Sequence, residues 1–327
     1  MNARPAVPVP GVGGHPPGVM LVLSENWTMT SPRDLRALVQ LAVEAEHAGV
    51  ETVMLSEHVV LGSQADAHGR PANPREYAAP GNQDPAMPWH DSVVLAAAIA
   101  SATTRVRIAL AAVIAPLRHP LLLAKQLATL DLLSEGRIVV QPTVGWHEQE
   151  YEALGVPFAE RGAILDEELE AMHAVWRDHP ASHQGRFFAF REMYAEPRPY
   201  RLDGLQMWFG GQTLHDAILR RLVRYGHGLH PFGPLRDDDV DRLHEALRAA
   251  GRDPAWFELI GGIRGRFADG RSTADLDEAL RSIPDQLRLG CTSIACKPSM
   301  FSDDRRDVPD ICRTVARRVR EAAAARL

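Results

Sequence analysis

Proton-transfer chemistry is indicated by Glu57 and His58, an acid and an imidazole that directly follow the apolar run 52–55. An imidazole has an unperturbed pKa of about 6.5, so His58 can hydrogen-bond a substrate or exchange a proton near neutral pH. A structural histidine at the end of a strand is the alternative from position alone. Successive side chains of a strand point to opposite faces, so Glu57 and His58 need not act as one pair.

An anion-binding turn is indicated by Gly210, Gly211, Gln212 and Thr213, which join the apolar run 205–209 to a helical pattern. Glycines let the backbone approach a ligand closely, and free N–H groups at the start of a helix carry positive partial charge. We expect Thr213 to cap this helix and the turn to suit a phosphate. An ordinary strand-to-helix turn is the alternative. The glycine fingerprints of dinucleotide-binding and P-loop folds are absent from the sequence.

Two further candidates lie at the ends of apolar runs. Glu25 comes after the run 19–23, and the segment Thr143-Val144-Gly145-Trp146 lies at the end of the run 138–144. The next residues, 147–151, begin His-Glu but lack the second histidine of a zinc-protease HExxH motif. No spacing among the 14 histidines and three cysteines suggests a metal cluster or a disulfide framework. We therefore expect no metal site.

The elements that must position these residues follow from an alternation of short apolar runs with amphipathic helical patterns. The run 106–114 is nearly all apolar, which is typical of a strand covered on both faces in a parallel sheet. Eight strand–helix units in 327 residues predict an α/β fold, a single (β/α)8 TIM barrel over residues 1–327. The strands are expected at 19–23, 52–55, 106–114, 138–144, 205–209, 228–230, 259–264 and 293–296.

The helices between these strands can also be placed from the sequence. Ser31 with Pro32 predicts a capped helix start, and 120–133 reads as a helix that ends at Gly136. Later helical patterns cover 238–250, 273–289 and 308–325. In a barrel of this kind, functional residues lie at the C-terminal ends of the strands, where the polar positions described above all fall.

Three segments break the alternation. Residues 59–89 are rich in proline and glycine and follow the second strand, so we expect a lid loop at the C-terminal mouth of the barrel, with a disordered insertion as the alternative. Residues 184–190 look like a small hairpin. Residues 1–17 are expected to form a flexible segment, because they are rich in proline and glycine and contain no apolar core.

The composition excludes several classes of protein. The net charge is −6, whereas a dedicated nucleic-acid binder would show a basic excess. No apolar stretch reaches the roughly 18 residues needed to span a bilayer, and the N-terminus does not resemble a signal peptide. We therefore expect a cytoplasmic protein that acts on a small molecule and binds neither nucleic acid nor membrane.

Several sequence blocks resemble the bacterial-luciferase-like superfamily of flavin and deazaflavin barrel enzymes, and the nearest branch is the coenzyme F420-dependent oxidoreductases. The resemblance is clear over about residues 18–232 and looser beyond. It rests on the blocks taken together: Leu55-Ser56-Glu57-His58-Val59, Thr104-Arg105-Val106-Arg107-Ile108, Pro116-Leu117-Arg118-His119-Pro120, residues 123–131, Leu133-Ser134-Glu135-Gly136-Arg137, Val144-Gly145-Trp146-His147-Glu148 and Gly155-Val156-Pro157-Phe158.

The resemblance implies a role for each candidate residue. His58 would lie beside the cofactor ring with Glu57 as its acidic neighbour, and Glu25 matches the position of an acid in deazaflavin-dependent sugar-phosphate dehydrogenases. A non-prolyl cis peptide would buttress the ring at Ala111-Ala112. The remaining cofactor contacts would come from the turn Thr143, Val144, Gly145 and Trp146, and from the phosphate-binding turn Gly210, Gly211, Gln212 and Thr213.

Departures from the family pattern bear on the cofactor. The family usually has glycines where this chain has Gln141-Pro142-Thr143, so the wall of the ring pocket is expected to differ. Luciferases place an arginine for the FMN phosphate where this chain has Val144, which favours coenzyme F420 over FMN. The resemblance thus implies hydride transfer between F420 and a small organic substrate. An FMN-dependent monooxygenase is the first alternative, and a non-catalytic flavin-binding relative is the second.

Family members commonly dimerise through helices on one side of the barrel. In this chain those helices correspond to 91–102 and 120–133, and the first is rich in alanine, which lets helices approach closely. A homodimer is therefore expected, with ordinary packing of these helices on the barrel as the alternative.

Overall fold

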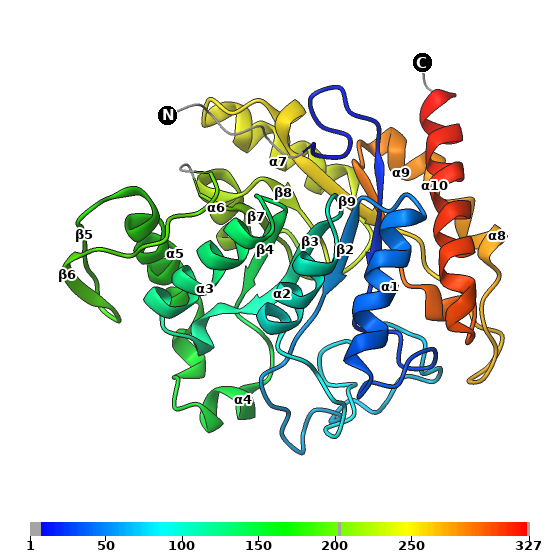
Figure 1. Ribbon diagram of the computed structural model, residues 1–327, viewed down its shortest axis with the longest axis horizontal. Coiled ribbons are helices and arrows are strands. Elements are labelled where there is room, and N and C mark those ends of the chain that lie inside the picture. Colours follow the sequence, from blue (N-terminus) through cyan, green and yellow to red (C-terminus); the bar gives the residue numbers. More distant parts are fainter. Residues whose placement is uncertain (1–7, 202–203, 326–327) are drawn as a thin grey trace.

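Eight parallel strands close into a barrel in the computed structural model, which describes residues 8–201 and 204–325. The first strand pairs with both the second and the last, since Met20 lies opposite Thr52 on one side and Ala295 on the other. The predicted (β/α)8 barrel is confirmed (Figure 1). In barrel order the strands are β1 (Gly18–Val22), β10 (Ser293–Cys296), β9 (Glu258–Gly262), β8 (Gly228–Leu229), β7 (Gln206–Phe209), β4 (Ile138–Thr143), β3 (Arg107–Ile114) and β2 (Thr52–Leu55).

Helices surround the barrel and connect its strands (Figure 1). They are α1 (Leu35–His47), α2 (Ser92–Ala102), α3 (Pro120–Leu133), α4 (Glu148–Ala153), α5 (Arg161–Arg177), α6 (Asp216–Tyr225), α7 (Asp237–Ala249), α8 (Leu276–Leu280), α9 (Ile283–Leu289) and α10 (Val308–Ala324).

Two helix predictions were wrong. The cap of α1 is Asp34, whose Oδ1 accepts from the Ala37 N–H at 3.0 Å, whereas Ser31 belongs to a turn before the helix. The predicted helix 273–289 is two helices, α8 and α9. Pro284 has no N–H to donate to the preceding turn, so the first helix ends and a second begins at this point.

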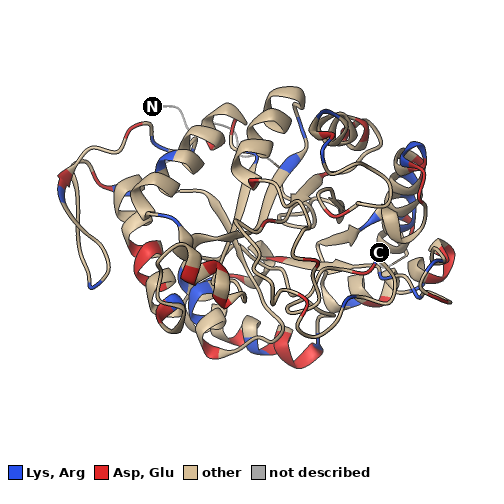
Figure 2. Cartoon of the chain, turned by 90° about the horizontal axis from the view of Figure 1, so that it is seen from below, with Lys and Arg blue, Asp and Glu red and all other residues tan. Residues whose placement is uncertain are grey.

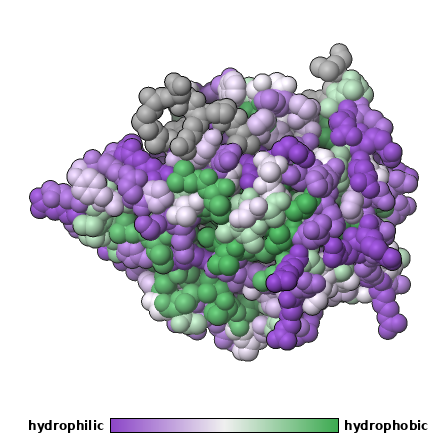
Figure 3. Space-filling model, in the orientation of Figure 1, coloured by the Kyte–Doolittle hydropathy of each residue, from purple (hydrophilic) through white to green (hydrophobic). Residues whose placement is uncertain are grey.

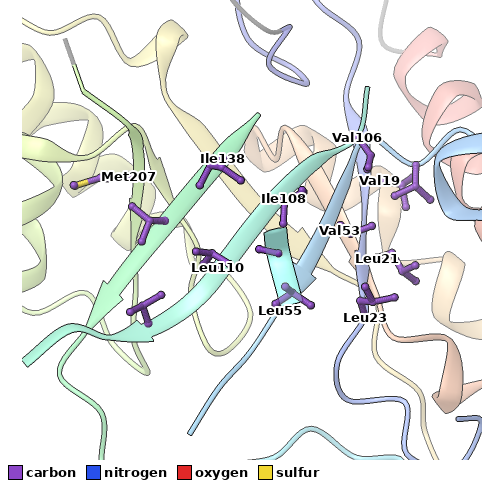
Figure 4. Packing of buried hydrophobic residues seen from close by; sticks show 14 of the residues in the cluster. Val19, Leu21, Leu23, Val53, Leu55, Val106, Ile108, Leu110, Ile138 and Met207 are labelled. Atoms are coloured by element: carbon purple, nitrogen blue, oxygen red, sulfur yellow. The ribbon is translucent and has the colours of Figure 1, made fainter. Parts of the chain in front are cut away.

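The core has an outer and an inner set of apolar side chains, because alternate residues of each strand point to opposite faces. The outer set faces the helices and includes Leu21, Val53, Ile108 and Leu110, all fully buried (Figure 4). The inner set fills the barrel and consists of Met20, Val22, Met54, Ala109, Ala111, Val139, Trp208, Ile260 and Ala295. The interior of the barrel is therefore filled by side chains, and a ligand can bind only at one of its two ends.

A buried ion pair closes the N-terminal end of the barrel. Arg107 Nη1 lies 2.7 Å from Glu258 Oε2, and Arg107 Nη2 also donates to Gln206 Oε1 at 2.6 Å. Glu258 also accepts from Trp208 Nε1 at 2.8 Å, so the ion pair and the inner apolar layer are connected. Both charges are paired and hydrogen-bonded, as buried charges must be. This end is sealed, which leaves the C-terminal mouth for a ligand.

Residues 59–89, here called the strap, contain no helix or strand and cross the C-terminal side of the barrel, at the bottom of Figure 1. Seen from below in Figure 2, the coloured acidic and basic residues gather mainly on the outer helices. The expected hairpin is confirmed as β5 (Ala181–Gln184) and β6 (Ala189–Met193), which project from the body (Figure 1). Of the predicted flexible segment 1–17, residues 8–17 have no helix or strand, and 1–7 lie outside the described residues. No helix in the described part of the chain is long and apolar enough to cross a membrane.

Candidate active site

A cavity of about 1380 Å³ opens at the C-terminal ends of the strands. Most pockets that hold one small ligand measure about 300–1,000 Å³, so this cavity has room for a cofactor and a substrate together. Its lining includes His58, Glu25, Glu57, Ala111, Ala112, Thr143, Val144, Gly145, Trp146, Gly210, Gly211 and Gln212. The candidate residues that followed separate strands in the sequence therefore meet at one cavity, with Thr143 only half-buried and Thr213 outside the lining.

His58 is paired with Glu150, a residue that the sequence analysis did not select. His58 Nδ1 lies 3.1 Å from Glu150 Oε2, and the Glu150 side chain is fully buried. The other carboxylate oxygen of Glu150 accepts from the backbone N–H groups of Val59 and Val60 at 2.6 and 3.2 Å. A carboxylate only accepts hydrogen bonds, so in the neutral imidazole of His58 the proton lies on Nδ1 and Nε2 is the unprotonated nitrogen.

Aromatic rings enclose His58 on the cavity side. Its ring meets Trp146 and Trp89 edge-on, with centroids 5.6 and 5.4 Å away. Trp89 is the last residue of the strap, and Trp146 belongs to the turn 143–146 that was predicted to contact the cofactor ring. These rings restrict the rotation of the imidazole and shield it from water, which suits a residue that must keep one orientation.

Glu57 has a different set of partners. Its carboxylate accepts from Arg118 Nη1 at 2.8 Å, from the Ser92 hydroxyl at 2.6 Å and from the Ile114 N–H at 3.2 Å. These contacts join the end of β2 to α2 and to the end of β3. Glu57 and His58 therefore have separate partners, and Glu57 holds the strand ends in place.

Glu25 lies in the cavity wall opposite Lys297. Its carboxylate accepts from the Ser56 hydroxyl at 2.7 Å, and Lys297 Nζ lies 3.7 Å from its Oε2 atom. Lys297 is fully buried and donates to the carbonyl of Glu76 in the strap at 2.7 Å. Burial lowers the pKa of Lys297, while the nearby Glu25 carboxylate acts against that shift.

The strap is tied to the barrel at both of its halves. Near its start, Gly62 N–H donates to His147 Nε2 at 2.7 Å, next to the Glu150 contacts. Near its middle, Asn73 Nδ2 donates to the carbonyls of Asp269 and Ser272, and Arg75 forms an ion pair with Asp303. After these contacts in the sequence, Tyr77 packs against the inner apolar layer of the barrel from its C-terminal side. The strap therefore forms a wall of the cavity with defined contacts to the β4, β9 and β10 sides.

The peptide bond between Ala111 and Ala112 is cis, as the resemblance implied. It lies at the end of β3, where the register with β4 shifts between Ala111 and Val113. Both alanines line the cavity, so a flat ligand can approach the backbone at this irregularity. Gly145 in the neighbouring turn has a φ of +64°, a conformation that favours glycine.

The turn after β7 differs in part from its prediction. Helix α6 begins at Asp216 with His215 as its N-cap, so the prediction that Thr213 caps this helix was wrong. Thr213 is exposed and lines a small depression beside the cavity. Gly210 is required by close packing, because a Cβ atom there would lie 1.7 Å from the carbonyl oxygen of His230. Neither Gly210 nor Gly211 has a positive φ.

A second pair missed by the sequence analysis lies on the cavity floor. Gln141 points inward from β4, and His230 follows β8, with a distance of 2.7 Å between His230 Nδ1 and Gln141 Oε1. Burial lowers the pKa of His230 to about 4. The departure of residues 141–143 from the family glycines was the only sequence signal, and it did not point to His230.

The fold and the site define a (β/α)8 barrel whose ligand cavity lies at the C-terminal ends of its strands, the arrangement of barrel enzymes. The chain belongs to the luciferase-like monooxygenase family, whose sequence pattern matches residues 18–283. The predicted resemblance is thereby confirmed.

The chain is similar to the following proteins and solved structures. An uncharacterized protein of Mycobacterium tuberculosis is 37% identical over 214 residues, which cover 64% of this chain and 73% of the relative. The monooxygenase RslO1 from Streptomyces bottropensis superposes with a TM-score of 0.70 at 19% identity, over 91% of this chain and 97% of that one. An F420-dependent secondary alcohol dehydrogenase superposes with a TM-score of 0.67 at 15% identity, over 93% and 99%. These two structures share the fold with this chain.

Proposed function

We propose that the protein is an oxidoreductase that transfers a hydride between coenzyme F420 and a small organic substrate. The observation that carries this proposal is the meeting of the His58–Glu150 pair with Ala111 and Ala112 at one cavity of about 1380 Å³. When bound, F420 would supply the carbon that gives or takes the hydride. The protein would supply orientation, a proton route and the exclusion of water.

The residues present fit a ring cofactor with an anionic tail. The ring would lie against Ala111 and Ala112, and the segment 143–146 would cover its side. The backbone of Gly210, Gly211 and Gln212 lines the same cavity and would receive the phosphate. Val144 offers no charge where an FMN phosphate would need an arginine, and this supports F420.

His58 would exchange the proton that accompanies hydride transfer. Glu150 keeps the proton of the neutral ring on Nδ1, so Nε2 is free to accept the hydroxyl proton of an alcohol or, once charged, to protonate a carbonyl oxygen. Glu25 is the second acid at the cavity, and its contacts with Ser56 and Lys297 hold it in place.

A monooxygenase that uses reduced FMN is the second candidate, and Arg161 favours it. This residue begins α5 and lines the cavity, and its Nε atom is buried without a hydrogen-bond partner among the described residues. A guanidinium beside a helix N-terminus suits a terminal phosphate dianion.

A cofactor titration separates the two candidates. We expect the fluorescence of F420 to be quenched when the cofactor binds to the protein, with a Kd in the micromolar range or tighter. FMN should bind much more weakly. Tight binding of reduced FMN with oxygen consumption would replace the first proposal by the second. Binding of neither cofactor would contradict both and leave a non-catalytic relative.

A further inference from the structure

The start of the strap is held by side chains of one short stretch of chain. Backbone N–H groups within residues 59–64 donate to side chains within residues 147–150. The bonds run from Val59 and Val60 to Glu150 Oε1 at 2.6 and 3.2 Å, from Gly62 to His147 Nε2 at 2.7 Å, and from Gln64 to Gln149 Oε1 at 3.0 Å. These two stretches are here called the latch. Each of its bonds depends on a side-chain acceptor and not on a backbone carbonyl.

His147 is the latch residue that loses its acceptor when it takes up a proton. Its Nε2 atom accepts from Gly62, so in the closed latch Nε2 carries no proton and the proton of the neutral ring lies on Nδ1. An imidazolium has an N–H donor at both nitrogens and no acceptor. Protonation would therefore set two donors against each other across 2.7 Å. Rotation of the ring does not restore the bond, because both nitrogens then carry protons.

The groups around His147 act on its protonation in both directions. Burial lowers the pKa of the imidazole and is the largest effect, and His58, at the end of β2, acts in the same direction. Glu150 and Glu152 of α4 act against that shift. The ring of Trp146, which lies against the imidazole with centroids 4.9 Å apart, is uncharged. The pKa is lower in the closed latch than in an exposed histidine, so the latch is most stable above about pH 6.5 and weakens as the pH falls.

The middle of the strap is attached in a different way. Asn73 Nδ2 donates to two backbone carbonyls and Lys297 Nζ donates to a third, and both donors keep their protons in acid. Arg75 forms an ion pair with Asp303 and holds the pKa of that carboxyl below its usual range. None of these contacts needs a neutral imidazole. Mild acid should therefore act on the start of the strap and leave its middle attached to the barrel.

We propose that His147 makes the start of the strap a pH-sensitive latch, closed while the imidazole is neutral and released when it is protonated. The segment that is released begins directly after His58, and the carboxylate that pairs with His58 also binds Val59 and Val60. Release therefore loosens the chain beside this imidazole. The inference concerns the strap and does not depend on which cofactor the cavity binds.

The test measures hydrogen exchange of single backbone amides by NMR, in wild-type protein at pH 7.5 and 5.5. A released His147 with the ordinary pKa of about 6.5 is about 90% protonated at pH 5.5, so release can become at most about tenfold more favourable. We expect the protection factor of the Gly62 amide, corrected for the pH dependence of chemical exchange, to fall about three- to tenfold. The Arg75 amide is the reference, because it donates to Asn73 Oδ1, which does not titrate, and its protection factor should not change.

Variants assign the effect to His147. In His147→Gln the amide oxygen can accept from Gly62 and does not titrate, so the fall in protection at Gly62 should disappear. His68→Gln is the matched control: His68 is an exposed histidine of the strap, with Nδ1 3.4 Å from the carbonyl oxygen of Pro80. The fall at Gly62 should keep its wild-type size in this control. The ring nitrogen resonances of His147 in wild type should also titrate with the midpoint at which Gly62 loses protection.

Each outcome supports or overturns the latch. A fall of less than about threefold at Gly62, or an equal fall at Arg75, overturns it. A fall that persists in His147→Gln assigns the effect to another group, such as Glu150, and also overturns it. If that variant does not fold, the wild-type titration decides: ring resonances of His147 that titrate apart from the loss of protection overturn the latch. Binding of neither F420 nor FMN contradicts the proposed function and leaves this inference intact.

Discussion

His58 Nδ1 lies 3.1 Å from Oε2 of Glu150, a buried carboxylate 92 positions further along the chain. The same carboxylate receives the backbone N–H groups of Val59 and Val60, with which the strap begins. One side chain thus sets both the orientation of the imidazole and the path of the strap. A change at Glu150 should therefore act through His58 on turnover and through the strap on local order.

Replacement of Glu150 by Gln should reduce kcat about 10- to 100-fold, because a partner that orients an imidazole typically contributes this much, while KM changes little. His58→Ala should reduce kcat by about 10²–10⁴-fold with a small effect on cofactor affinity. Steady-state kinetics and a cofactor titration measure both effects.

Gln149→Ala is the control for Glu150. Gln149 Oε1 accepts from the Gln64 N–H, so its loss loosens the strap near the same place and leaves His58 untouched. Equal kcat values for Gln149→Ala and Glu150→Gln would show that the strap, and not the imidazole, responds to Glu150. An unchanged kcat in His58→Ala would remove His58 from the mechanism.

The turn after β7 should bind the cofactor phosphate through its backbone. Gly211→Val should weaken cofactor binding about tenfold, because the added side chain would occupy the space beside the turn that the phosphate oxygens need, and its Cβ atom would lie 2.8 Å from Ile218 Cδ1. Gln212→Ala should bind as wild type, since its N–H remains. Thr213→Ala should unfold at the wild-type denaturant midpoint, since Thr213 does not cap α6. If Gln212→Ala weakens binding as much as Gly211→Val, side chains hold the anion.

Lys297 should be needed to hold the strap against the barrel. In Lys297→Met the bond to the Glu76 carbonyl is lost and the buried Glu25 carboxylate loses its nearest cation. We expect the free energy of unfolding to fall by about 3 kcal/mol and amide exchange at residues 76–78 to accelerate. Arg70→Met is the control, because Arg70 pairs with Asp66 and Asp84 within the strap. Unchanged amide exchange at residues 76–78 in Lys297→Met would mean that the other contacts of the strap hold it against the barrel without Lys297.

Acid should destabilise the protein through His230. Its folded pKa of about 4 lies below the unfolded value of about 6.5, so only the unfolded state takes up this proton between those pH values. The contribution is complete above pH 6.5 and is lost as the pH falls towards 4. It amounts to at most about 3 kcal/mol.

The buried carboxyl of Glu168 acts in the opposite direction, because burial raises its pKa well above the usual range. The contribution of His230 is therefore measured as a difference between wild type and His230→Gln, by denaturant unfolding at pH 7.5 and 4.5. The advantage of wild type over the variant should shrink by about 2–3 kcal/mol at the lower pH. An advantage that does not change with pH would show that His230 is protonated in the folded state.

We propose that the protein forms a homodimer through α2 and α3. Val94 is 70% exposed and Leu122 is 56% exposed, and hydrophobic residues gather where Figure 1 places these helices (Figure 3). An apolar patch of this kind is typical of an interface. Light scattering at micromolar concentration should give about twice the chain mass of 36.0 kDa, and Leu122→Glu should give the chain mass. A monomeric wild type would contradict the proposal.

The sequence by itself determined the barrel fold and the end of the barrel at which the site lies. Short apolar runs such as 52–55 and 138–143 can only be buried as strands covered on both faces, and each is followed by a helix. Parallel strands bring their C-terminal ends to one rim, so His58 and Trp146 were predicted to meet although neither lies near the other in sequence. The resemblance then supplied the cis peptide at Ala111-Ala112, which local pattern does not reveal.

Only the tertiary structure decided which side chains form pairs. The segment 147–151 matches only part of a zinc-protease motif and gives no signal for Glu150 in the sequence. The partner of His58 depends on how α4 packs against the start of the strap. His230 and Gln141 are 89 positions apart and meet only because β4 and β8 flank β7 in the closed barrel. The start of α6 was also decided by the tertiary structure: the helix begins at Asp216, beyond Thr213. Propensity is local, whereas partner choice depends on barrel closure.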